Sequence, residues 1–346
     1  MKKLLLCCIL ILVFNTQASA AEFTAPVVPV QAEKYFPESQ ESFANDLWYI
    51  FKSVIADIYP DFTDATKICL RVVAVILLGT FLNGSNGGYK RTVSLIQVVT
   101  ISVILLGPSR AMLALGVDTV TELLEYSKLL APVLTGTLAA QGGMTASTAL
   151  YIGTTIFNTV MGSFINGLLV PLVYGYIAIS VADNAIGEDA LKRIKSFIKW
   201  LMTWSLKIII YVFTGYMSIT GVVSSSADAT AIKAAKLTIA GVVPIVGNII
   251  SDASDAVLGS AAVIKNSVGI YGLLAVAAIW MAPFIRVGAH YLLLKLTTAV
   301  CAVFDQNAST KLTDDYCTVL GCVMAMISLT SLLTLISTVC FMKGIS

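Results

Sequence analysis

The sequence predicts an all-α, polytopic membrane protein, and three observations carry that prediction. Hydrophobic residues make up 57% of the 346 residues and charged residues only 12%, whereas soluble domains carry roughly 25% charged residues. The mean hydropathy is +0.87. Uncharged runs long enough to cross a bilayer occupy residues 92–109, 129–182 and 316–342. We expect about six transmembrane helices (roughly five to eight), with short broken or re-entrant helical hairpins.

The net charge indicates no nucleic-acid partner. The formal charge is only +2 at pH 7, and the composition shows no basic patch with interleaved aromatic residues. The lipid bilayer is the partner that the composition itself implies.

The first 20 residues are typical of a secretory signal peptide. Lys2 and Lys3 form a positive n-region, Leu4 to Phe14 an apolar h-region, and Ala18-Ser19-Ala20 a small-residue cleavage site. The apolar core of the segment is shorter than the about 20 residues that a spanning helix needs. We expect a cleaved signal peptide, with an uncleaved anchor as the alternative. Residue 21 onward then begins outside the cytoplasm.

Residues 21–67 form an acidic extracytoplasmic arm. Apolar residues at helical spacing between Phe43 and Ile58 predict a short amphipathic helix within it. The remainder, 68–346, is the multi-span membrane domain.

The charge pattern of the membrane domain predicts its spans and turns. Lys90-Arg91 and the basic half of 183–199 mark two cytoplasmic loops under the positive-inside rule. An apolar hairpin is expected over about 129–147, and a kink at Pro171 in the span that follows. The expected spans are 68–82, 92–109, 149–182, 200–223, 266–285 and 316–342, with an apolar segment over 286–304.

A stretch from Thr214 to Gly269 fits neither a loop nor a span. Its centre contains Gly241, Pro244 and Gly247, a combination that disfavours a continuous helix. We therefore predict two short helices joined by an apolar break. The hairpin carries four further candidate charges: Asp228, Lys233, Lys236 and Lys265. The two hairpin lysines before the break could pair with carboxylates across the hairpin or meet lipid headgroups.

Asp252 and Asp255 are the most notable carboxylates of this hairpin. On a helix starting near residue 248, they share one polar, small-residue stripe with Gly259 and Asn266. One interpretation is a pore- or partner-facing stripe, because ionisable residues at membrane depth are costly and mark pathways or partners. The other is an interfacial helix whose polar side lies in water.

A candidate parallel internal repeat relates the hairpin to an earlier segment. An offset of 112 residues carries Pro132 onto Pro244 and Pro171 onto Pro283. The candidate repeat units are about 94–204 and 205–316. Repeats of this kind build several transporter folds.

Motifs for catalysis are missing from the sequence. It contains no GxxxxGK[ST], HExxH or GxSxG, and its single histidine is His290. Its cysteines show no metal-type spacing. We expect a non-enzymatic protein with no catalytic, cofactor or metal site.

The hairpin also carries a family resemblance. It resembles the stage III sporulation protein AE family in Ser226-Ala-Asp228, Lys236, Pro244-Ile-Val-Gly247, Ser251-Asp252, Asp255, Gly259, Lys265-Asn266 and Gly269. The signal peptide, the length and the polytopic remainder are similar to that family as well.

This resemblance implies a function in endospore-forming bacteria. Members belong to the mother-cell membrane that faces the forespore, within a multi-subunit channel or secretion-like complex needed for spore development. The implied partners are the other stage III sporulation A membrane proteins and a forespore membrane protein, with ATP hydrolysis in a separate subunit. The alternative is a stand-alone secondary transporter or permease built from repeated broken-helix units.

Overall fold

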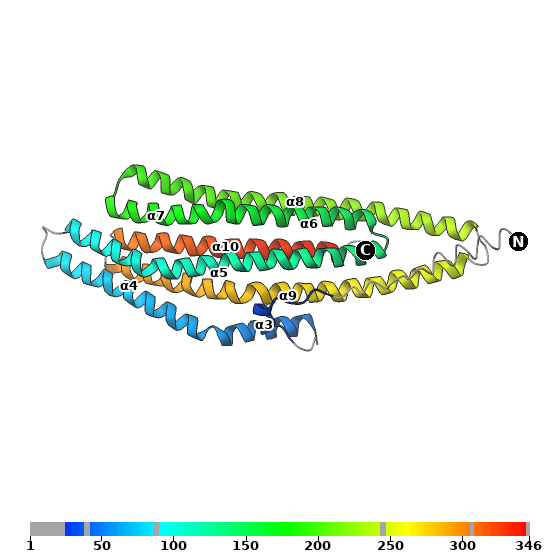
Figure 1. Ribbon diagram of the computed structural model, residues 1–346, viewed down its shortest axis with the longest axis horizontal. Coiled ribbons are helices and arrows are strands. Elements are labelled where there is room, and N and C mark those ends of the chain that lie inside the picture. The colour runs from blue at the N-terminus through cyan, green and yellow to red at the C-terminus, as the bar shows by residue number, and fades with distance from the viewer. Residues whose placement is uncertain (1–24, 38–41, 86–89, 243–246, 305–307, 344–346) are drawn as a thin grey trace.

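The structure is a computed structural model that describes residues 25–37, 42–85, 90–242, 247–304 and 308–343, without the side chains of 83–85 and 217–265. The described residues form helices, turns and short extended segments, and no strand occurs among them (Figure 1). The predicted signal peptide, 1–20, lies outside them. The helices are α2 (Val30–Glu33), α3 (Phe43–Asp57), α4 (Tyr59–Ser85), α5 (Lys90–Ala140), α6 (Met144–Phe164), α7 (Val170–Ile186), α8 (Asp189–Val242), α9 (Gly247–Phe304) and α10 (Ala308–Lys343), with a π-helical segment, η2 (Ile165–Leu169), between α6 and α7.

Six of the described segments are long and apolar enough to cross a membrane, which confirms the predicted fold class. Three helices are much longer than one crossing requires. At 1.5 Å per residue, the 51 residues of α5, 54 of α8 and 58 of α9 extend roughly 77, 81 and 87 Å. The hydrocarbon core of a bilayer is only about 30 Å thick. Large parts of these helices must therefore lie outside it.

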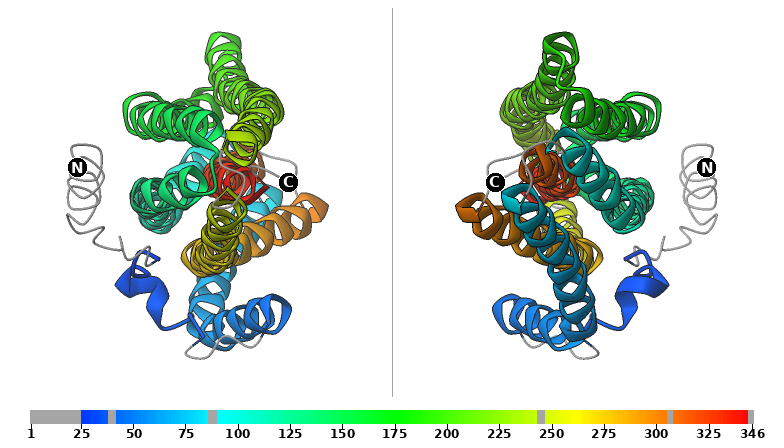
Figure 2. Two further views of the ribbon diagram at one scale, coloured as in Figure 1. Left: turned by 90° about the vertical axis from the view of Figure 1, so that its right-hand side faces the viewer. Right: turned by 90° about the vertical axis from the view of Figure 1, so that its left-hand side faces the viewer.

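Helix α10 forms the centre of the bundle. It contacts α5, α6, α7, α8 and α9, and Figure 2 shows it surrounded by them. Buried hydroxyl and amide groups link the helices, as in the pair Thr154–Ser337, 2.6 Å apart, and the hydrogen bond from Asn158 to Ser127. Such bonds and close packing, rather than water exclusion, hold helices together in lipid.

Close helix packing depends on glycines that the sequence did not single out. A Cβ atom added to Gly116 of α5 would lie 2.4 Å from Cγ1 of Val323 in α10. By contrast, Gly167 and Gly175 have nothing within 4 Å of an added Cβ atom.

Several predicted boundaries are corrected by the structure. Helix α5 is continuous through Pro108 and Pro132, so the turn falls at residues 141–143, where Gly142 has a φ of 90°. The segments 266–285 and 286–304 belong to one helix, α9, which contains Pro283. Proline is tolerated inside membrane helices because neighbouring groups satisfy the backbone carbonyls that it frees.

A helix, α3, occupies the segment of the arm that was predicted to be amphipathic, and it buries Ile50 and Val54. Helix α4, however, begins at Tyr59, within the segment assigned to the arm. The repeat stays a prediction, and the 112-residue offset would carry the turn at 141–143 onto residues 253–255, inside α9.

Candidate functional site

The predicted hairpin corresponds to the C-terminal part of α8 and the N-terminal part of α9, which project from the bundle. Helix α8 ends at Val242, one residue after Gly241, and α9 begins at Gly247, so the helices stop and start where the sequence indicated a break. Pro244 lies outside the described residues. The prediction of two short helices is wrong, because both continue without interruption into the bundle. The reason is physical: the run from residue 208 to 227 holds no charge or proline that would end α8.

The backbone places the remaining hairpin residues on these two helices. Asp228, Lys233 and Lys236 lie on α8, and Asp252, Asp255, Gly259 and Lys265 lie on α9. Their side chains are outside the description, so the predicted stripe and charge pairs stay predictions. Asn266, the last member of the stripe, is exposed.

Together these residues form a two-helix projection, which we call the α8–α9 extension (217–242 and 247–265). Gly269 of α9 lies against Met342, near the end of α10. The 22 residues from there back to Gly247 extend roughly 33 Å. Figure 1 shows both helices continuing past the turn between α5 and α6 and past the C-terminus.

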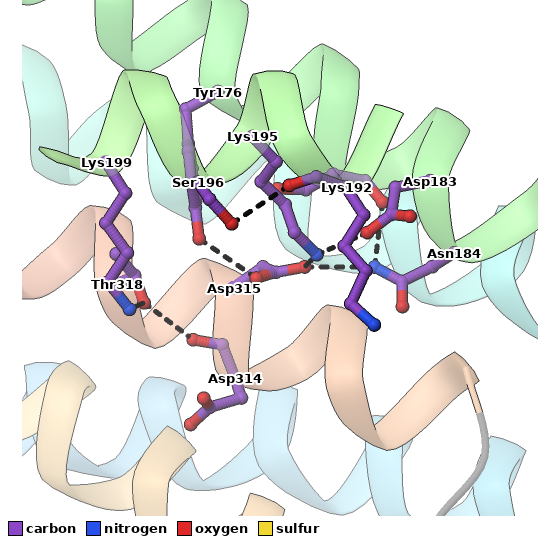
Figure 3. Close-up of polar contacts among 11 residues, drawn as sticks. Tyr176, Asp183, Asn184, Lys192, Lys195, Ser196, Lys199, Asp314, Asp315 and Thr318 are labelled. Carbon is purple, nitrogen blue, oxygen red and sulfur yellow. Dashed lines mark hydrogen bonds and ion pairs between the residues drawn. The ribbon is translucent and has the colours of Figure 1, made fainter. Parts of the chain in front are cut away.

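The structure also brings together a polar cluster that the sequence did not predict. We call it the Lys195 cluster: Tyr176, Asp183, Asn184, Lys195 and Asp315. Lys195 Nζ lies 2.5 Å from Oδ2 of Asp183 and 2.9 Å from Oδ2 of Asp315. Tyr176 and Asn184 each donate a hydrogen bond of 2.9 Å to the Asp315 carboxylate (Figure 3). The three charged side chains are only 12–16% exposed.

Local structure positions this cluster. Helix α7 ends at Ile186, and the next residue, Gly187, has a φ of 80° and donates its N–H to the Asp183 carbonyl. The tight turn returns the chain as α8, so that Lys195 faces α7 and α10. One lysine and two carboxylates leave a formal charge of −1. The cluster ties three helices together at one end of the bundle.

The neighbouring ion pair is different in kind. Lys295 of α9 lies 2.5 Å from Asp314, but these side chains are 51% and 46% exposed. Asp314 and Asp315 are adjacent in sequence and differ in burial, which makes them a natural pair for comparison.

A second group of charges fastens the N-terminal arm to the bundle. We call it the arm clip: Lys34, Tyr35, Asp57, Asp61 and Arg286. Lys34 lies 2.6 Å from the Asp57 carboxylate, to which Tyr35 donates a hydrogen bond of 2.5 Å. Arg286 of α9 reaches Asp57 at 3.4 Å and Asp61 at 2.9 Å.

The clip shifts the ionisation of its arm residues. Hydrogen bonds from Lys34 and then Tyr35 hold the pKa of Asp57 below its usual value. The hydrogen bond to Asp57 raises the pKa of Lys34. The pKa of Tyr35 is raised chiefly by burial, and then by its bond to Asp57.

One face of α5 is polar over a length that would cross a bilayer. Between Gly107 and Lys128, no large hydrophobic side chain of this helix is exposed. The residues exposed there are Arg110, Ala111, Ala114, Asp118, Thr121, Glu125 and Lys128. Glu122 of the same segment lines a cavity of about 280 Å³ with Lys34 and Arg286 of the arm clip. In contrast, α6 exposes Tyr151, Ile152, Ile156 and Val160.

The described residues contain no group of three or more histidine, cysteine or acidic side chains that could hold a metal ion. The five cysteines from Cys69 onward are free. Both polar clusters consist of ion pairs and hydrogen bonds that join helices.

A family sequence model described as stage III sporulation protein AE matches residues 30–344. The chain belongs to the stage III sporulation protein AE family. A curated relative, the stage III sporulation protein AE of Bacillus subtilis (strain 168), is 22% identical over 275 residues, covering 77% of this chain and 67% of the relative. No solved structure matches the chain. The family membership predicted from the hairpin residues is confirmed. The chain is therefore a sporulation-related membrane protein, and the family description names no class of enzyme.

Proposed function

We propose that the chain is a non-enzymatic, integral subunit of a sporulation-specific channel or secretion-like complex between mother cell and forespore. The observation that carries the proposal is the polar face of α5 between Arg110 and Lys128, which directly follows the uncharged run 92–109 on the same helix. Ionisable residues inside a membrane are costly unless they face water or protein. A subunit that lines a passage or contacts another subunit has a use for such a face.

The ends of the helices support an orientation for this subunit. The start of α5, the turn between α7 and α8, and the start of α10 lie at one end of the bundle. Lys90, Arg91, Lys192 and Arg193 are near that end, and the positive-inside rule assigns it to the mother-cell cytoplasm. The α8–α9 extension would then project towards the forespore.

The family membership supports the partners that we propose. These are the other stage III sporulation A membrane proteins and a forespore membrane protein, with ATP hydrolysis in a separate subunit. The extension would offer them a surface beyond the bundle, and α5 would supply a face within it.

Deletion in a spore-forming bacterium, with complementation by this chain, tests the proposal. Spores should fail to mature without the gene, and the tagged protein should co-purify in mild detergent with other sporulation membrane proteins. Normal spore counts after deletion would contradict the proposal. Purification as a complete, active carrier without partners would favour the secondary transporter instead.

A sharper test concerns the two carboxylates of the extension. Asp252→Ala with Asp255→Ala should lower the count of heat-resistant spores by at least an order of magnitude while leaving the protein in the membrane, because the predicted stripe is partner- or pore-facing. Asp118→Ala with Glu125→Ala provides the corresponding test of the α5 face. Wild-type spore counts from the first double variant would contradict the partner- or pore-facing stripe, and would mean that residues 252 and 255 belong to an ordinary solvated helix face.

A further inference from the structure

An aromatic and cationic stripe follows the outer side of α8. Its members are separated by three or four residues, the spacing that places side chains on one helix face. All of them are exposed: Arg193, Phe197, Trp200, Trp204, Lys207 and Tyr211. We call this set the α8 stripe.

The rings of the stripe stack on one another and not on the bundle. The centroids of Phe197 and Trp200 are 5.9 Å apart, and those of Trp200 and Trp204 are 5.6 Å apart, with interplanar angles of 26° and 18°. The two indoles remain 52% and 51% exposed. The bundle-facing side of α8 is formed by other residues, such as Met202 and Phe213, which are buried. Core packing therefore does not explain why aromatic residues occupy this face.

The cations of the stripe are not neutralised within the described part of the chain. Arg193 and Lys207 have no carboxylate within ion-pair distance there, and neither has the neighbouring Lys192. Lys195, by contrast, turns inward to the carboxylates of the Lys195 cluster. The exposed cations of this part of α8, Lys192, Arg193, Lys199 and Lys207, outnumber its exposed acids, Glu188 and Asp189. The outer surface is therefore net positive, and it complements an anionic surface.

The sequence that follows the stripe has the length of a membrane crossing. Residues 208–227 contain no charged residue, and 20 residues of helix extend about 30 Å, the thickness of the hydrocarbon core. Tryptophan and tyrosine collect at the boundary between headgroups and acyl chains. Lysine and arginine there extend their charged ends to the phosphates.

We propose that the α8 stripe is a docking surface for anionic phospholipids of the bilayer leaflet at the basic end of the bundle. Trp204 lies at the boundary between headgroups and acyl chains, and Trp200, roughly 6 Å before it along α8, lies among the headgroups. Lys207 extends its ammonium group back to the headgroup phosphates from just inside that boundary, and Arg193 approaches them from the water side. This fixes where the membrane begins along α8. A protein partner could cover the aromatic rings, but it would not account for the uncharged run of bilayer length directly after Lys207.

Tryptophan fluorescence in vesicles tests the depth. The chain has four tryptophans, so Trp48→Phe with Trp280→Phe leaves only those of the stripe. In phosphatidylcholine vesicles containing phosphatidylglycerol, bromine near the headgroup end of the acyl chain should quench them most. Strongest quenching by bromine near the methyl end would overturn the proposed depth. Quenching by aqueous iodide alone, or by neither quencher, would mean that water or protein covers the stripe, and would also overturn it.

Charge-neutral variants test the lipid preference. Each cation near a membrane surface contributes about fivefold to the affinity for anionic lipid, so Arg193→Gln with Lys207→Gln should reduce the preference for phosphatidylglycerol over phosphatidylcholine roughly 25-fold. Native mass spectrometry of the purified protein measures the retained lipids. Lys52→Gln with Lys67→Gln removes the same charge from exposed positions elsewhere and should change little. An equal loss in both double variants would refute the assignment of the preference to the stripe.

Discussion

Asp314→Ala and Asp315→Ala should have very different effects on stability, although the two residues are neighbours. Asp315 receives charge-assisted contacts from Lys195, Tyr176 and Asn184 and is 13% exposed. Removing one partner of a buried ion pair costs about 3–5 kcal/mol. Lys195 keeps Asp183, so we expect the low end, about 3 kcal/mol. The exposed pair of Asp314 and Lys295 contributes only about 0–1 kcal/mol.

The measurement is unfolding of the purified protein in mixed micelles, titrated with SDS and followed by tryptophan fluorescence. A difference of about 2–3 kcal/mol corresponds to roughly 30- to 150-fold in the unfolding equilibrium. Lys195→Met should be at least as damaging, because Asp183 and Asp315 would then face each other without a cation. Adding Asp183→Asn and Asp315→Asn to it should recover much of the loss, since buried ion groups can be replaced by neutral ones at little cost. Equal shifts for Asp314→Ala and Asp315→Ala would refute the reasoning.

Two further predictions concern packing and pH. Gly116→Ala should destabilise the bundle by about 1–3 kcal/mol in the same unfolding titration, because its added methyl group would overlap Val323. The control variant Gly167→Ala has free space for the methyl group and should be neutral or stabilising. Equal effects of the two variants would contradict this account. The arm clip should loosen in acid, because the partners of Asp57 lower its pKa. The contribution of Asp57 to holding the arm is present above the usual carboxyl pKa near 4, and it is lost as the pH falls through the lowered value. The raised pKa of Lys34 gives a contribution that is present below its usual pKa and lost as the pH rises through the raised value. Spin labels on the arm and on α9 would report both transitions as a longer distance, and Asp57→Asn should abolish the acid transition; a distance independent of pH would contradict the role of the clip.

The sequence predicted the parts of the fold that depend on composition and local pattern. Long uncharged runs indicated about six spans, and the apolar spacing from Phe43 indicated α3. It failed where tertiary contacts override local preference: Pro132 sits inside α5, which packs against α10, α9 and α6. Proline and glycine mark a break only where no neighbour compensates, as at Gly241 and Gly247, where α8 does end and α9 does begin.

The Lys195 cluster could not be derived from the sequence because its members come from three helices. Asp183 follows the uncharged run 129–182, and Asp315 precedes the run 316–342. The position of an acid at the end of each uncharged run is the feature of the sequence that could have pointed to the cluster. Only the packing of α7, α8 and α10 shows that Asp183 and Asp315 both contact Lys195. The α8 stripe is a basic segment with interleaved aromatic residues, so the expectation that the chain has no such patch is wrong. The small net charge of the whole chain does not reveal a local cluster of this kind.

The membrane boundary proposed along α8 also indicates where the α8–α9 extension lies relative to the bilayer. On α8, the uncharged run ends at Asp228; on α9, a run of the same length, 266–285, begins directly after Lys265. Both helices run from the bundle to a shared tip, and the change from charged to uncharged lies 14 residues from Val242 on α8 and 18 residues from Gly247 on α9. The two helices are therefore expected to leave the hydrocarbon at nearly the same level, within roughly 6 Å. Asp252 precedes Asn266 by 14 residues, which places it roughly 21 Å beyond that level. This position of the membrane boundary therefore places residues 252 and 255 in the aqueous space. It favours contact with a partner there, and not the lining of a pore within the bilayer, as their role.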